Sequence, residues 1–105
     1  QERERVLLLM LDSRNHLLGE QVLSVGTVNA SLLSPRELFL TALKNSAVYV
    51  MLLHNHPGGD PSPGRADLAA TKQIAEASRL IEIPLLDHII IGDKKYYSFR
   101  ENGLL

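Results

Sequence analysis

The chain has 105 residues, carries 11 Lys and Arg against 12 Asp and Glu, and contains no Cys. This length supports one domain with a single core, and the formal charge of -1 lacks the basic excess expected of a nucleic-acid-binding segment. The absence of Cys excludes disulfides, thiolate catalysis and Cys-ligated zinc, and it is compatible with the reducing cytoplasm, where we expect the protein to reside.

The first half of the sequence predicts a hairpin followed by a helix. The apolar residues 6–11 indicate a strand buried on both faces, and residues 12–15 indicate a turn. An extended segment at about residues 16–25 is expected to complete the hairpin. A capping box at residues 34–37, with Pro at the first helical position, predicts a helix over about residues 35–45.

The second half predicts a central strand, a shaped loop and a long helix. Residues 48–53 are a continuous apolar run typical of a buried strand, and residues 57–64 are rich in Pro and Gly. Ser62 is expected to be the N-cap and Pro63 the first residue of a helix that runs to about residue 80. That helix is expected to pack on the sheet through one apolar stripe, which consists of Ala70, Ile74, Ala77 and Ile81.

The last part of the chain predicts a second hairpin. Residues 85–91 and 95–99 have strand character, and Gly92 and Asp93 form the turn. Helices that alternate with strands, together with two hairpins, predict a single α/β domain in which a mixed sheet is flanked by helices. No apolar run approaches the roughly 20 residues that a membrane span requires, so no membrane association is expected. Because the chain begins at Gln1 without Met, we expect it to be part of a longer protein.

The segment His54-Asn55-His56-Pro57, followed by Asp67, is the most informative feature of the chain. The spacing of the two histidines puts both on one face at the end of a strand, and Asp67 falls in the first turns of the following helix. An isolated pair of this kind is more often an ordinary surface or core feature. Two imidazoles and a carboxylate without Cys, however, are typical of a catalytic zinc site that keeps a fourth position for water. We therefore predict that His54, His56 and Asp67 bind Zn²⁺.

These motifs resemble those of the JAMM (MPN+, JAB) metalloprotease-like domains, and within them the RadC-like proteins. The JAMM pattern is an upstream Glu, then H-x-H-P, then Asp after ten intervening residues, as this sequence has it. The segments typical of RadC-like proteins stand in the right order: Pro35-Arg36-Glu37, His54-Asn55-His56-Pro57-x-Gly59-Asp60, Leu86-Asp87-His88 and a terminal Tyr97-Ser98-Phe99-x-Glu101-x-Gly103. The resemblance covers residues 1–105, which we expect to be the C-terminal domain of a longer protein, with a JAMM/MPN-like, cytidine-deaminase-like architecture.

The resemblance implies a zinc-dependent metallohydrolase similar to JAMM peptidases and isopeptidases, with a peptide or protein as substrate. A water polarised by the metal would lose its proton to an upstream Glu and attack an amide carbonyl. In RadC-like sequences a Glu stands eight residues before the Asp that ends the first strand motif, and Glu4 precedes Asp12 by that spacing. Glu4 is therefore the predicted base and Glu20 its competitor, although each also fits an ordinary exposed charge.

One position departs from the pattern. Gly64 stands where JAMM enzymes and most RadC-like proteins carry a Ser that donates a hydrogen bond to the developing oxyanion. Loss of such a donor typically costs about 10² to 10³ in rate, so catalytic activity stays open. Ser62 could substitute, but a role as N-cap is favoured. The alternative function is a catalytically weak or inactive metal-binding or assembly module, in a family historically labelled as DNA repair proteins.

Three further polar residues have both a structural and a functional interpretation. For His88 packing or hydrogen bonding within the sheet is favoured, whereas Asp87 fits a structural role and a place beside the ligands equally well. Arg65 is expected to be exposed, with anion binding as the alternative. A zinc deaminase is excluded because its Cys ligands and its H-x-E motif are absent. Pairing of subunits through the terminal hairpin is compatible with the sequence.

Overall fold

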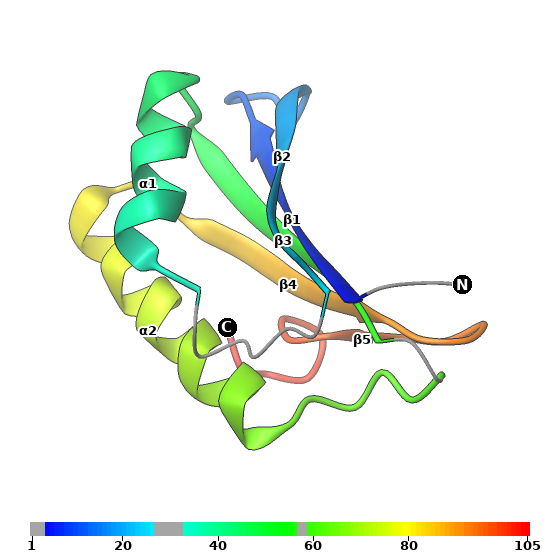
Figure 1. The fold of residues 1–105 in the computed structure, drawn as a ribbon. Helices are drawn as coiled ribbons and strands as arrows, with labels where there is room; N and C mark the ends of the chain where they lie inside the picture. The colour runs from blue at the N-terminus through cyan, green and yellow to red at the C-terminus, as the bar shows by residue number, and fades with distance from the viewer. Residues whose placement is uncertain (1–3, 27–32, 57–58) are drawn as a thin grey trace.

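The computed structural model describes residues 4–26, 33–56 and 59–105, with side chains for residues 5–23, 33–56 and 59–105. The described residues form five strands and two α-helices in the predicted order (Figure 1). The elements are β1 (Glu4–Leu11), β2 (Leu17–Gly26), α1 (Pro35–Lys44), β3 (Tyr49–Asn55), α2 (Arg65–Ile81), β4 (Leu85–Ile91) and β5 (Tyr96–Ser98). The predicted α/β fold with a mixed sheet is confirmed.

The five strands form one sheet in the order β2-β1-β3-β4-β5. β1 pairs antiparallel with β2 and with β3, and β4 pairs antiparallel with β5, so both predicted hairpins are present. β3 and β4 are parallel, and α2 connects them. Parallel strands end at the same edge of a sheet, and ligands of open α/β sheets typically bind beyond that edge. The histidine motif stands at this end of β3.

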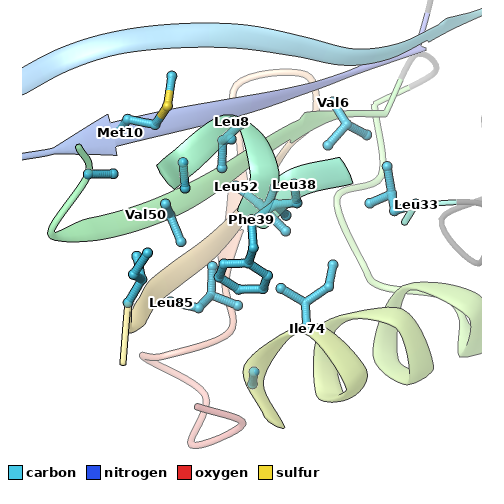
Figure 2. Close-up of a cluster of buried hydrophobic side chains, with 14 residues drawn as sticks. Val6, Leu8, Met10, Leu33, Leu38, Phe39, Val50, Leu52, Ile74 and Leu85 are labelled. Carbon is cyan, nitrogen blue, oxygen red and sulfur yellow. The ribbon is translucent and has the colours of Figure 1, made fainter. Parts of the chain in front are cut away.

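The hydrophobic core lies between the sheet and the two helices, which cover the same sheet face (Figures 1 and 2). Alternate strand residues point into it, as the period of two requires, and they meet apolar side chains of both helices. Its larger members are Val6, Leu8, Met10, Leu38, Phe39, Val50, Leu52, Ile74 and Leu85. Leu7 and Leu9 on the other face are only half-buried, so the prediction that β1 is buried on both faces was too strong.

The start of α2 differs from the prediction. The N-cap is Gly64 and the first helical residue is Arg65, so the assignment of Ser62 and Pro63 to these positions was wrong. The cause is a local turn, in which the Ser62 N–H donates to Asp60 Oδ1 at 3.0 Å. The helix begins only where the Asp67 carboxylate accepts the Gly64 N–H at 2.9 Å.

The other end of α2 also corrects a detail of the predicted stripe. Ala70 and Ile74 are buried and Ala77 is half-buried, but Ile81 is 40% exposed. The helix ends at Ile81 because Glu82 adopts a left-handed conformation, with φ 65° and ψ 36°. After this turn Ile83, which is 5% exposed, fills the core position instead. Neither described helix is long and apolar enough to span a membrane.

Candidate metal centre

Three predicted ligands meet where β3 ends and α2 begins. His54 Nδ1 lies 3.6 Å from Asp67 Oδ1, and His56 Nε2 lies 3.7 Å from Asp67 Oδ2. One donor atom from each of the three side chains lies within 4.8 Å of the others. The two imidazole rings are nearly perpendicular, with centroids 4.6 Å apart. Among the described residues, His54, His56 and Asp67 form the one group of His, Asp and Glu side chains close enough to hold a metal ion.

The donor set and its spacing fit zinc. On a tetrahedral zinc ion with bonds of roughly 2.0–2.1 Å, neighbouring ligand atoms are about 3.4 Å apart. The distances from His54 to Asp67 Oδ1, 3.6 Å, and from His56 to Asp67 Oδ2, 3.7 Å, are near this value, and each runs to a different carboxylate oxygen. His54 and Asp67 are buried, while His56 is half-buried, so the side of His56 is open to a water molecule or a substrate. The group thus offers three side-chain donors and one accessible side to a metal ion.

The orientation of the His56 ring is fixed by the loop that follows it. His56 Nδ1 lies 3.1 Å from the Asp60 carbonyl oxygen, which can only accept, so Nδ1 carries the proton. The lone pair is then on Nε2, the atom that faces Asp67. Main-chain bonds hold the same segment, because the His56 N–H donates to Ile91 at 2.8 Å. Backbone carbonyl partners of this kind typically set the tautomer of metal-binding histidines.

Two glycines allow the loop to pack against the end of β4. The Gly59 carbonyl accepts the Asp93 N–H at 3.0 Å. A Cβ on Gly92 would stand 2.1 Å from that same carbonyl oxygen, closer than real side chains come. Gly59 itself has a φ of +101°, a conformation that favours glycine. The backbone of Gly59 therefore lies directly against the turn that follows β4, and this contact supports the neighbouring Asp60 carbonyl beside His56.

Asp67 is positioned by the start of its own helix. It occupies the third helical position, is 7% exposed, and accepts the Gly64 N–H through Oδ2. A carboxylate near a helix N-terminus also interacts favourably with the helix dipole. The side chain is therefore held with its two oxygens toward the histidines before any ion binds.

His88 lies behind the predicted ligands, in the helix-facing layer of the sheet. It is 1% exposed, and Thr71 Oγ1 lies 2.6 Å from its Nδ1. Its ring stacks on Phe99 at 4.6 Å and lies 5.8 Å from the His54 ring. Burial, together with the nearby His54, lowers the pKa of His88 to about 4, so the ring is neutral at pH 7. The stacking on Phe99 and the hydrogen bond to Thr71 confirm the structural role that was favoured for His88.

The other polar candidates are exposed or have structural hydrogen bonds. Asp87 accepts from Ser98 Oγ at 2.6 Å and from the backbone of His88 and Arg100, which identifies the structural role. Arg65 is exposed at the first position of α2. Glu20 is exposed and pairs with Leu9, whose partner in β3 is Met51. Glu20 therefore belongs to the sheet face opposite the histidines.

Glu4, the predicted base, is the first residue of β1, and its side chain lies outside the described side chains. The backbone register is nevertheless defined. Val6 is the partner of His54, and Arg5 is the partner of Asn55. The Arg5 N–H also donates to Asn55 Oδ1 at 2.5 Å. The middle residue of the histidine motif thus fixes the start of β1 against the end of β3.

A cleft opens beside His56 at the carboxyl ends of the parallel strands. Its volume is about 530 Å³, and it is lined by Asn55, His56, Gly59, Ile91, Gly92, Asp93 and Lys94. The lining combines an apolar side chain, two glycines and both signs of charge. Such a mixed surface beside a candidate ion site is suited to a polar substrate with some apolar parts.

Two contributors to the site were not predicted from the sequence. Thr71, which contacts His88, stands four residues after Asp67, and this helical spacing was the available signal. The Asp60 carbonyl, which holds His56, has no sequence signal because every residue has a carbonyl.

The comparisons with known proteins agree with this geometry. The family described as RadC-like JAB domain matches residues 1–104. A UPF0758 protein of Desulforamulus reducens is 47% identical over 99% of the chain, and one of Methanosarcina mazei is 46% identical over all of it. A UPF0758 protein of Geobacillus thermodenitrificans is 45% identical over 96% of the chain. The chain spans a little under half the length of these relatives, 45–46%. The chain therefore belongs to the RadC-like JAB domain family.

Proposed function

We propose that this chain is a zinc-dependent metallohydrolase domain that cleaves an amide bond, a peptide or isopeptide bond of a protein substrate. His54, His56 and Asp67 hold the ion in this proposal. The observation that supports it is their convergence within 4.8 Å, on a chain of the RadC-like JAB family. We also place the domain in the cytoplasm, in line with its lack of Cys.

A bound zinc ion supplies a water that is acidic near neutral pH and polarises a carbonyl group. Glu4 acts as the general base in this proposal, taking the proton of the attacking water and returning it to the leaving nitrogen. The register supports this choice, because position 4 belongs to the same alternate set as Val6, the partner of His54. Position 20 belongs to the other set.

The cleft beside His56 is the place for the substrate. Ile91 offers an apolar surface that is 40% exposed, and Lys94 and Asp93 line the same cleft. An extended peptide in this cleft would pass over Gly59 and Gly92, which have no side chains, and contact the side chains that line it on either side. This arrangement would bring an amide carbonyl to the open side of the ligand group.

Metal analysis tests the first step of the proposal. Protein purified without added zinc should contain about one ion per chain. His56→Ala should lose the ion, whereas His16→Ala should retain it, because the His16 side chain is 72% exposed in the distant first hairpin. A wild-type protein that neither retains nor takes up zinc would contradict the proposed metal site.

A peptide library tests the second step. Turnover by the zinc-loaded wild type should fall by about 10² or more in Glu4→Gln, as expected for loss of a general base. Glu20→Gln is the matched control and should keep wild-type turnover. Equal losses in both variants would contradict the assignment of Glu4.

The second candidate is a metal-binding assembly module without efficient catalysis. It is favoured by Gly64, which provides no side-chain donor beside Asp67. Full zinc occupancy without turnover of any peptide would support it. A DNA-repair role receives no support from the charge of -1 on this segment.

A further inference from the structure

His88 is a polar residue that is almost completely buried, with only one of its two ring nitrogens hydrogen-bonded within the described part of the chain. It is 1% exposed, and its Nε2 has no hydrogen-bond partner among the described residues. Burying a polar atom without a partner costs free energy, so an apolar ring would be the more stable choice at this position. The stability of the fold therefore does not account for a histidine here.

The contacts of His88 lead to both elements that supply the ligands. Its partner in β3 is Leu52, two residues before His54, and its ring stacks against the His54 ring at an interplanar angle of 20°. On the other side, its Nδ1 is hydrogen-bonded to Thr71 Oγ1. Thr71 lies one helical turn after Asp67, on the same face of α2.

These contacts form a connection between the strand and the helix. The hydrogen bond to Thr71 sets the distance of the first turns of α2 from the sheet, and thereby the distance of Asp67 from the histidines. Phe99 stacks on His88 at 4.6 Å and 7°, so the His88 ring cannot tilt freely. A fixed His88 ring then limits the movement of the His54 ring.

We propose that His88 and Thr71 are positioning residues for the metal centre, which hold the His54 ring and the Asp67 carboxylate at the separation that one ion requires. This inference rests on the proposed metal site. Replacement of residues that hydrogen-bond to metal ligands typically changes metal affinity by about 10- to 100-fold, and we expect an effect of this order from His88, which stacks on His54.

The decisive variant is Thr71→Val combined with His88→Phe. It replaces both partners of the hydrogen bond by apolar side chains of similar shape and also removes the unpartnered Nε2. Such a replacement is expected to leave the melting temperature equal or higher. The zinc dissociation constant, measured on metal-free protein by competition with a chromophoric chelator, should nevertheless rise by about 10- to 100-fold. Stability and metal affinity would then change independently.

Single variants separate the two contacts. His88→Phe retains a stacked ring without the hydrogen bond, and Thr71→Ser retains the hydroxyl. Thr71→Ser should bind zinc within about threefold of the wild type, whereas Thr71→Val should bind about tenfold more weakly. The absorption bands of bound Co²⁺ should shift in Thr71→Val and not in Thr71→Ser, because these bands report ligand geometry. If the double variant does not fold, this pair of Thr71 variants decides the same question.

Ser78→Ala is the matched control. Ser78 is a buried residue of the same helix, 3% exposed, and its hydroxyl donates to the Ala75 carbonyl at 2.7 Å. Its removal should leave zinc affinity unchanged. A wild-type affinity in the double variant, or an equal loss in Ser78→Ala, would overturn the inference alone. A wild type that binds no zinc would overturn the proposed metal site and this inference with it.

Discussion

The Asp87 carboxylate accepts a hydrogen bond of 2.6 Å from the Ser98 hydroxyl, which joins the start of β4 to the end of β5. The same carboxylate accepts the N–H of Arg100 at 3.0 Å, and Ser98 Oγ accepts the N–H of Glu101 at 3.0 Å. Ser98 is 2% exposed. The pair therefore closes the C-terminal turn and keeps Phe99 in place behind His88.

Replacement of Ser98 by Ala should destabilise the fold without touching the predicted ligands. The Asp87 carboxylate would lose one partner in a partly buried place, and the expected cost is about 1–3 kcal/mol. Urea unfolding followed by circular dichroism measures it. Ser13→Ala, in the exposed first turn, should change the free energy of unfolding by less than about 0.5 kcal/mol. Similar values for the two variants would show that the Ser98 contact contributes little.

Replacement of Gly92 by Ala should displace the loop that holds His56. The new Cβ would overlap the Gly59 carbonyl oxygen and the Pro61 ring, and overpacking of this kind costs about 1–3 kcal/mol. Zinc affinity should fall as well, because the Asp60 carbonyl moves with the loop. Gly19→Ala is the control, since its Cβ would meet only Met10 Cε at 3.7 Å. An unchanged zinc affinity in Gly92→Ala would mean that the loop shifts without moving His56.

Replacement of Glu82 by Gly should stabilise the protein. The left-handed conformation costs a non-glycine residue about 1–2 kcal/mol, and the extra freedom of unfolded Gly offsets about 0.4–1 kcal/mol of that gain. We expect a net gain of about 0.5 kcal/mol in thermal or urea unfolding. Glu76→Gly, at an exposed position inside α2, should instead lose about 1 kcal/mol. Losses of equal size in both variants would contradict the prediction.

The first turn should show a depressed carboxyl pKa. The backbone N–H of His16 at 2.9 Å, with that of Arg14 at 2.8 Å, lowers the pKa of Asp12 below its ordinary value of 3.8. Because the folded value is the lower one, the contribution to stability is present above pH 3.8 and is lost as the pH falls through the folded value. Carboxyl chemical shifts followed by NMR give the midpoint. A midpoint at or above 3.8 would contradict this prediction.

Replacement of Gly64 by Ser should increase hydrolysis if the missing hydroxyl limits it. The backbone has a φ of -84°, and a new Cβ would stand 3.7 Å from Asp67 Oδ2, an ordinary contact. Turnover of library peptides should rise by about 10² relative to the wild type. Gly64→Ala fills the same space without a hydroxyl and should give no gain. Equal turnover in these two variants would exclude a role for the hydroxyl.

The order of the elements followed from local patterns. The apolar runs predicted β1 and β3 as strands, and Ser34 before Pro35 predicted the start of α1, because these signals act over a few residues. The predicted burial of both faces of β1 was too strong, since burial depends on what packs on each face of the sheet. The predicted start of α2 was wrong, because Ser62 and Gly64 both precede plausible first turns. The hydrogen bond from the Gly64 N–H to the Asp67 carboxylate determines that the helix starts after Gly64, and this bond depends on the conformation of the folded loop.

The convergence of His54, His56 and Asp67 followed from chain order, since a strand and the next helix must meet at the connecting loop. The connection through Thr71 and His88 could not be predicted in the same way. It requires the parallel pairing of β3 with β4, which depends on contacts far apart in the sequence. Single residues in the sequence carry no sign of such a pairing.

The hydrogen bond from the Arg5 N–H to Asn55 has a consequence for how the site can fail. A shift of β1 by one residue against β3 would exchange the two sets of alternate β1 positions between the faces of the sheet. The side chains of His54, His56 and Asp67 would remain together, because all three come from residues 54–67. Under the proposed function, such a shift would therefore abolish turnover while leaving the three predicted ligands in place.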